Sequence, residues 1–83
     1  MKVLYFAWLK SKTGIAAEEV APPADVRHVA ALIDWLVARG PGHAAAFANR
    51  AIVRAAVNKR MVGHDAAIAP GDEIAFFPPV TGG

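Results

Sequence analysis

The residues of this sequence best suited to carry out chemistry are its last two, Gly82 and Gly83. Glycine has no Cβ, so the backbone of this pair can enter a channel that is too narrow for any other dipeptide. The one reactive group there is the terminal α-carboxylate, which is an anion at neutral pH because its pKa is about 3.5. A carboxylate is a poor electrophile, so we expect it to be activated first, typically by ATP as a mixed anhydride with AMP. The activated acyl group can then accept sulfur, giving a thiocarboxylate, or an amine, giving an amide.

The residues before the glycines favour a tail that projects from a folded domain. Pro78 and Pro79 fix φ and favour an extended path. They follow directly on an apolar stretch that ends at Phe77, with no polar linker between them. We therefore expect a domain over residues 1–77 and a flexible tail over residues 78–83. The simpler interpretation is a frayed end without function, as at most chain termini.

Composition limits the classes of protein to which the chain can belong. It has 83 residues and no cysteine, which predicts one small domain and excludes a disulfide framework, a thiolate metal site and a cysteine nucleophile. The net charge is +2, and the basic residues are scattered except for the adjacent Lys59 and Arg60, so we expect no nucleic-acid partner. No apolar run of about 18 residues and no signal peptide is visible, so we expect a cytoplasmic protein that does not enter a membrane.

The remaining side chains show no independent active site. His28, His43 and His64 match no metal-binding spacing, and we interpret them as surface residues without a role. The neighbouring carboxylates Glu18 and Glu19 would point to opposite faces of a strand, which suits an acid/base pair poorly. We therefore expect no metal and no bound cofactor in the domain itself.

Periodic patterns predict the order strand, strand, helix, strand, short strand, strand. An apolar stripe between Val26 and Val37 predicts the helix, with Asp25 as its N-cap and Gly40 as its C-cap. Residues 42–50 fit either a short helix or a loop. The strands are expected at residues 2–9, 15–21, 52–57, 61–62 and 73–77, the first two joined as a hairpin across residues 10–14.

These elements predict an α+β fold with a mixed sheet of four to five strands and one main helix on one face. The first and last strands are nevertheless apolar on both faces, and strands that are buried on both faces need cover on both sides. By strand alternation, Phe6 and Phe77 lie opposite the face that the helix covers. We infer that another protein covers this second face. The alternative is a compact domain with a few exposed aromatic residues.

Three stretches of the sequence resemble the small subunit of molybdopterin synthase, a family of ubiquitin-like sulfur carriers. They are KVLYFA at residues 2–7, AVN at residues 56–58 and, most specifically, GDEIAFFPPVTGG at residues 71–83. The resemblance covers the whole length. It implies the ubiquitin-like β-grasp fold, whose strand order matches the predicted one.

The resemblance also implies a mechanism and a set of partners. An adenylyltransferase related to ubiquitin-activating enzymes would use ATP to adenylate Gly83, and a sulfur donor protein would help convert it to a thiocarboxylate. Gly82 and Gly83 would then enter the large synthase subunit, which carries the catalytic residues, and sulfur would pass to cyclic pyranopterin monophosphate in molybdenum cofactor biosynthesis. Two small and two large subunits would form a heterotetramer. The residues implied in partner contacts are Phe6, Met61, Phe77, Pro78, Pro79, Val80 and Thr81.

Other functions begin from the same chemistry. A sulfur carrier of another pathway, such as thiamine synthesis, would share the Gly-Gly end. A ubiquitin-like modifier would use the same adenylate to form isopeptide bonds to lysines through Gly83. A plain interaction module, in which the two glycines are incidental, is the remaining alternative.

Overall fold

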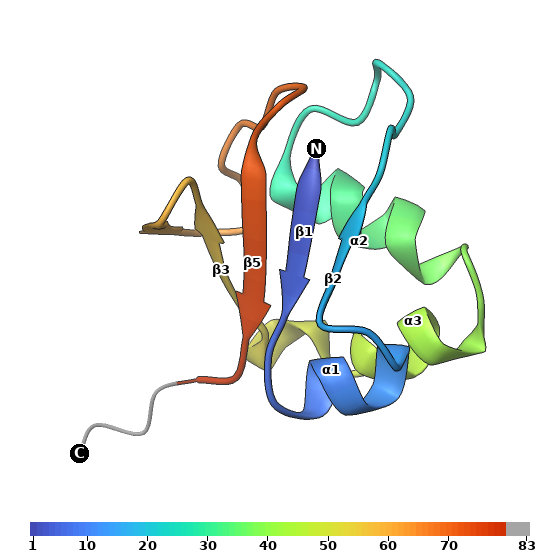
Figure 1. Cartoon of the computed structure of the whole chain (residues 1–83). Helices are drawn as coiled ribbons and strands as arrows, with labels where there is room; N and C mark the ends of the chain where they lie inside the picture. The colour runs from blue at the N-terminus through green and yellow to red at the C-terminus, as the bar shows by residue number, and fades with distance from the viewer. Residues whose placement is uncertain (80–83) are drawn as a thin grey trace.

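The structure, a computed structural model, describes residues 1–79 and is shown in Figure 1. The described residues form a sheet with helices packed against it. The elements in chain order are β1 (Lys2–Tyr5), α1 (Trp8–Thr13), β2 (Ala17–Glu19), α2 (Val29–Val37), α3 (Pro41–Ala46), the 3₁₀ helix η1 (Arg50–Ile52), β3 (Arg54–Val57), β4 (Arg60–Val62) and β5 (Glu73–Phe77).

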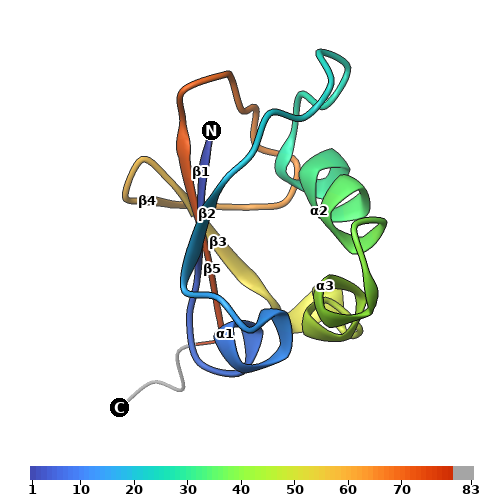
Figure 2. The ribbon, with the colours of Figure 1, turned by 45° about the vertical axis from the view of Figure 1, so that its right-hand side comes forward.

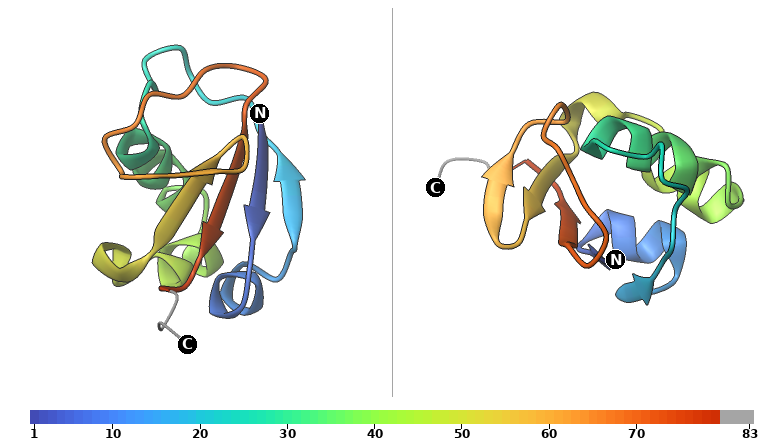
Figure 3. Two further views of the ribbon diagram at one scale, coloured as in Figure 1. Left: turned by 90° about the vertical axis from the view of Figure 1, so that its left-hand side faces the viewer. Right: turned by 90° about the horizontal axis from the view of Figure 1, so that it is seen from above.

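The sheet has five strands within residues 1–79, in the order β2-β1-β5-β3-β4. The first and last strands, β1 and β5, form a parallel pair, and the other neighbouring pairs are antiparallel. The left view of Figure 3 shows β3, β5, β1 and β2 side by side. The predicted mixed sheet of an α+β fold is therefore confirmed. Because β5 is the central strand, Pro78 and Pro79, which follow it, leave the sheet at the middle of its edge.

The helices lie against one side and one end of this sheet. Figure 2 shows α2 and α3 on one side of the strands and α1 across one end. The core between the layers contains Val3 and Tyr5 of β1, Ile74 and Phe76 of β5, Leu32, Ile33 and Leu36 of α2, and Phe47. At its centre, the ring of Phe76 lies 5.0 Å from the ring of Phe47 and 6.4 Å from that of Tyr5. This packing fixes which face of β1 and β5 is left uncovered.

The first strand is shorter than the sequence predicted. The strand expected over residues 2–9 ends at Tyr5, and α1 occupies the place of the expected hairpin turn. Ala7 adopts a φ of 54°, which ends the strand, and Leu9 then enters the core and is fully buried. Gly14 caps α1 with a φ of 80°, a conformation that glycine adopts without strain. The turn signal in the sequence was therefore a helix C-cap, although β2 still pairs antiparallel with β1 as expected.

The main helix begins later than predicted. α2 starts at Val29 and His28 is its N-cap, so the prediction of Asp25 as the N-cap was wrong. His28 also forms an isolated β-bridge with Ala67, nearly forty positions along the chain. This long-range pairing holds His28 in an extended conformation in place of a first helical turn, and no local pattern reveals it.

The Ala-rich segment folds as a short helix. α3 begins with Pro41 at a position where the missing N–H of proline costs nothing. Of the two interpretations left open for residues 42–50, the helix is therefore the one that the structure adopts, through Ala46. Three α-helices, in place of the one main helix predicted, pack on the sheet within residues 1–79. None of the helices in this part of the chain is long and apolar enough to span a bilayer.

Candidate functional site

The face of the sheet opposite α2 and α3, termed the outer face, carries a continuous apolar row. Cross-strand pairing places Ala17 beside Leu4, Leu4 beside Ala75, Ala75 beside Ala56, and Ala56 beside Met61. Directly opposed residues point to the same side of a sheet, so this row crosses all five strands of the described chain. Met61, at the end of the row, is 67% exposed. Ala17, at the other end, is also exposed, whereas Leu4 and Ala75 are half-buried and Ala56 is buried. A partly exposed apolar row that spans the sheet suits contact with another protein.

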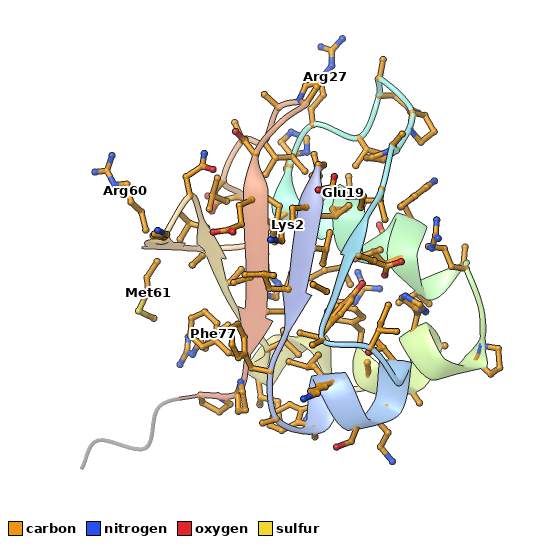
Figure 4. The ribbon with its side chains drawn as sticks, in the orientation of Figure 1. Lys2, Glu19, Arg27, Arg60, Met61 and Phe77 are labelled. Atoms are coloured by element: carbon orange, nitrogen blue, oxygen red, sulfur yellow. The ribbon has the colours of Figure 1, made fainter. Side chains whose placement is uncertain are left out.

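Phe77 and Phe6 extend this apolar surface toward the end of β5. Phe77 follows Ala75 by two positions in the same strand and therefore points to the same side. Phe6 stays paired with β5 because its N–H donates to the carbonyl oxygen of Phe76 at 3.1 Å, and it is 49% exposed. Met61 lies on β4, two strands from β5 and level with Ala75, and Figure 4 shows it at the same edge of the view as Phe77. The structure thus brings the three large hydrophobic residues singled out in the sequence onto one part of the surface.

The tail begins at this same place. Pro78 and Pro79 follow Phe77 directly, and each is partly exposed. The outer face and the start of the tail therefore adjoin. The other tail residues named in the sequence lie outside the described residues; they are Val80, Thr81, Gly82 and Gly83.

The rest of the described chain holds no arrangement that points to independent chemistry. Within residues 1–79, no group of three or more His, Asp or Glu side chains is placed to hold a metal ion. A largely apolar hollow of about 570 Å³ lies between the loops at residues 21–24 and 67–70, at the start of β5 and away from the tail. Arg27 is the one ionisable side chain that lines this hollow, so the hollow lacks a pair of groups for acid/base catalysis.

Known proteins that resemble this chain over its full length identify its family. The ThiS family model matches residues 3–83. The molybdopterin synthase sulfur carrier subunit of Escherichia coli (strain K12) is 43% identical over 83 residues, which make up 100% of this chain and 99% of that protein. This chain belongs to the ThiS family, among the molybdopterin synthase sulfur carrier subunits.

Solved structures of similar proteins support the assignment of this ThiS-family chain to the ubiquitin-like β-grasp fold. The putative molybdopterin converting factor subunit 1 from Pyrococcus furiosus is 33% identical, with a TM-score of 0.77 over 95% of each chain. The small archaeal modifier protein 1 of H. volcanii is 28% identical, with a TM-score of 0.74 over 96% of this chain and 97% of that one. The β-grasp fold that the resemblance implied is therefore confirmed.

This sulfur carrier also contains a polar cluster that sequence reasoning missed. The Tyr5 hydroxyl donates a hydrogen bond to Oε2 of Glu18 at 2.6 Å, and Nε2 of His43 lies 2.8 Å from the same oxygen. The Arg39 guanidinium lies 3.5 Å from Oε1. Burial raises the pKa of Glu18, but the hydrogen bonds of Tyr5 and His43 and the nearby charges outweigh it and leave this pKa below its ordinary value. Burial, together with the bond to Glu18, raises the pKa of the Tyr5 hydroxyl, so this group stays a donor.

The interpretation of His43 as a surface residue without a role was therefore wrong. It lies in α3, and its ring meets the edge of the Tyr5 ring with centroids 5.8 Å apart. The cluster ties β1, β2 and α3 together on the helix side of the sheet, so we assign it to stability. Its hydrogen-bonded pairs are 13 and 25 positions apart in the sequence, a separation that no local motif encodes. The His64 side chain also forms a hydrogen bond, since its Nε2 lies 2.8 Å from the carbonyl oxygen of Val53.

Proposed function

We propose that this chain carries sulfur for molybdopterin synthesis as a thiocarboxylate on Gly83. The observation that supports this most directly is the junction of the outer face and the tail: β5 ends at Phe77, beside Phe6, where Pro78 begins the tail. A partner that covers the outer face can therefore receive the tail in the same encounter. The full-length similarity to the Escherichia coli carrier supports the same function.

In the proposed cycle, the chain supplies the acyl group and its partners supply the catalytic residues. The Gly83 carboxylate attacks the α-phosphorus of ATP on an adenylyltransferase, pyrophosphate leaves, and an acyl-adenylate forms. Sulfur at the oxidation level of sulfide, from a donor protein, then attacks the acyl carbon and AMP leaves. The thiocarboxylate sulfur then replaces an oxygen substituent on a carbon of cyclic pyranopterin monophosphate, and water cleaves the acyl–sulfur bond, so that the sulfur stays on the product and Gly83 returns to a carboxylate. Each dithiolene needs two sulfur atoms, so the chain must be loaded twice for each product.

We propose two groups of partner contacts in this cycle. Phe6, Met61 and Phe77 would dock the outer face on the adenylyltransferase and later on the large synthase subunit, since burying a Phe side chain stabilises a contact by about 1.5–3 kcal/mol. Residues 78–83 would enter the active site of each partner, with Gly82 in the narrowest part. A dimer of large subunits with one carrier at each end would give the heterotetramer.

The mass of the protein purified from its own host tests this proposal. A thiocarboxylate differs from the carboxylate by one exchange of oxygen for sulfur, which intact mass spectrometry resolves. We expect this form in the unaltered protein and its absence in a variant that lacks Gly83. Detection of unmodified protein alone, in cells that are making molybdopterin, would contradict the proposal.

The likeness to small archaeal modifier protein 1 favours protein modification as a second candidate function. A modifier would join Gly83 to lysine side chains of other proteins through the same adenylate. The two functions differ in their products, because modification gives a ladder of larger conjugates on a denaturing gel. A carrier of a thiamine-type pathway would form the same thiocarboxylate, but would not support molybdopterin synthesis with the large synthase subunit.

A further inference from the structure

Methionine supplies all the side-chain sulfur of this protein. The sequence has two methionines, Met1 and Met61, and no cysteine. Met61 is 67% exposed, the largest fraction among the exposed large hydrophobic residues within residues 1–79. Met1, by contrast, is half-buried and packs against the core. Of the two sulfur atoms, that of Met61 is therefore the more open to an oxidant in solution.

The strand register explains why the Met61 side chain is left uncovered. Met61 lies directly opposite Ala56 of β3, whose side chain is too short to shield a thioether. Its neighbours in β4, Arg60 and Val62, point to the other side of the sheet. β4 is an edge strand in the described part of the chain, since it pairs with β3 alone. Figure 4 shows the Met61 sulfur, drawn in yellow, at the margin of the molecule.

Oxidation would change the apolar row of the outer face at its most exposed position. When hydrogen peroxide reacts with a thioether, the O–O bond breaks, an S–O bond forms, and the second oxygen leaves as water. The sulfur loses two electrons and the peroxide gains them. The product, methionine sulfoxide, is polar, so it no longer suits burial against an apolar surface. The isolated domain should keep its fold, because Met61 does not belong to the core.

We propose that Met61 is a redox-sensitive contact of the outer face, whose oxidation to the sulfoxide weakens docking on the large synthase subunit until the sulfoxide is reduced. This inference rests on the proposed function, in which Met61 contacts that subunit. Reduction uses two thiols, which become a disulfide while the oxygen leaves as water, and methionine sulfoxide reductases catalyse it. The carrier is free between docking events, so Met61 is sensitive then and protected in the complex.

The experiment treats the full chain with hydrogen peroxide, removes the peroxide with catalase, and measures binding to the untreated large synthase subunit by calorimetry. The chain is used without a thiocarboxylate, because sulfur on the tail would also react with peroxide. Peptide mapping by mass spectrometry locates the added oxygen. We expect Met61 to be oxidised before Met1, binding to weaken by about tenfold, and urea denaturation to stay unchanged. Treatment with methionine sulfoxide reductases should restore binding.

The matched control is Met61→Leu, which conserves the volume and apolar character of the side chain but has no sulfur. It should bind the large subunit like the unaltered chain and keep this binding after the same dose of peroxide. An equal loss of binding in Met61→Leu would overturn the inference, as would unchanged binding of the chain oxidised at Met61. Either result would leave the carrier function intact.

The complex provides a second test. Met61 should be oxidised more slowly when the large subunit is bound, and equal rates in the free chain and the complex would show that this partner does not cover it, which would also overturn the inference. Failure of the untreated chain to bind the large subunit at all would overturn both the inference and the proposed function.

Discussion

Tyr5 and Glu18 join the two strands at one side of the sheet through a hydrogen bond of 2.6 Å between a phenolic oxygen and a carboxylate. His43 reaches the same carboxylate oxygen from α3, and Arg39 reaches the other oxygen from beyond the end of α2. The Glu18 side chain is 14% exposed, so these bonds are only partly screened by water. One carboxylate of β2 thus connects β1 with the neighbouring ends of α2 and α3, which lie more than 20 positions further along the chain.

Replacing this carboxylate by Glu18→Gln is expected to make stability less dependent on pH. The folded-state pKa of Glu18 is below its ordinary value, so its stabilising effect is present above the unfolded-state pKa and is lost as the pH falls through the folded-state pKa. The bonds to a charged acceptor suggest a cost of about 1–3 kcal/mol at neutral pH. Urea denaturation of both proteins at pH ~7 and pH ~3 measures this cost. A difference in unfolding free energy that is the same at both pH values would contradict the role given to the charge.

Phe76→Ala and Phe77→Ala are expected to have opposite effects. Phe76 is fully buried between Tyr5 and Phe47, so its truncation should cost about 3–5 kcal/mol of stability. Phe77 points to the outer face, where most of its burial would come from a partner, so Phe77→Ala should mainly weaken binding of the large subunit. Denaturation curves and binding titrations of the two variants make the comparison. Stability loss confined to Phe77→Ala would show that the face assignment is wrong.

The sequence predicted the parts of the fold that depend on alternation within a strand. β5 has the bounds that its pattern indicated, and the same alternation placed Phe77 on the outer face and Phe76 in the core. It failed where a single residue changes the backbone direction: Ala7, with its φ of 54°, ends β1 and allows Trp8 to begin α1. An alanine carries no signal for such a conformation, because most alanines occupy the right-handed or extended regions.

The candidate site was predictable to a similar extent. The Gly-Gly end and the hydrophobic residues near it are local features, and they were visible without a structure. The row from Ala17 to Met61 was not, because it exists only when β2, β1, β5, β3 and β4 adopt their register.

Lys59→Gly is expected to stabilise the isolated domain. Lys59 has a φ of 70°, a conformation that costs a residue with a side chain about 1–2 kcal/mol. Glycine avoids this cost but gives the unfolded chain more freedom, worth about 0.5–1 kcal/mol, so the net gain should be about 0.5–1 kcal/mol. Thermal or urea denaturation measures it. Asn58→Ala is the control: it removes the bonds to Asp72 and Glu73 and should destabilise the domain. A loss of stability in Lys59→Gly would show that the turn is not strained at this position.

Gly82→Val and removal of Gly83 are expected to abolish sulfur transfer without a measurable effect on folding. A branched Cβ at position 82 would restrict φ and widen the chain where the proposed channel is narrowest. Loss of Gly83 shortens the tail by one residue, so its terminal carboxylate no longer reaches the reacting groups of the partner. The core packs around β1, β5 and α2, and none of its buried residues lies beyond Phe76 within the described chain. We therefore expect unchanged denaturation curves, no thiocarboxylate by mass spectrometry, and no molybdopterin in a reconstituted reaction.

The matched control is Lys12→Ala on α1, which should load and transfer sulfur normally. Normal loading of Gly82→Val by the activating enzyme would remove the narrow-channel argument, and molybdopterin synthesis by the chain without Gly83 would contradict the carrier function itself.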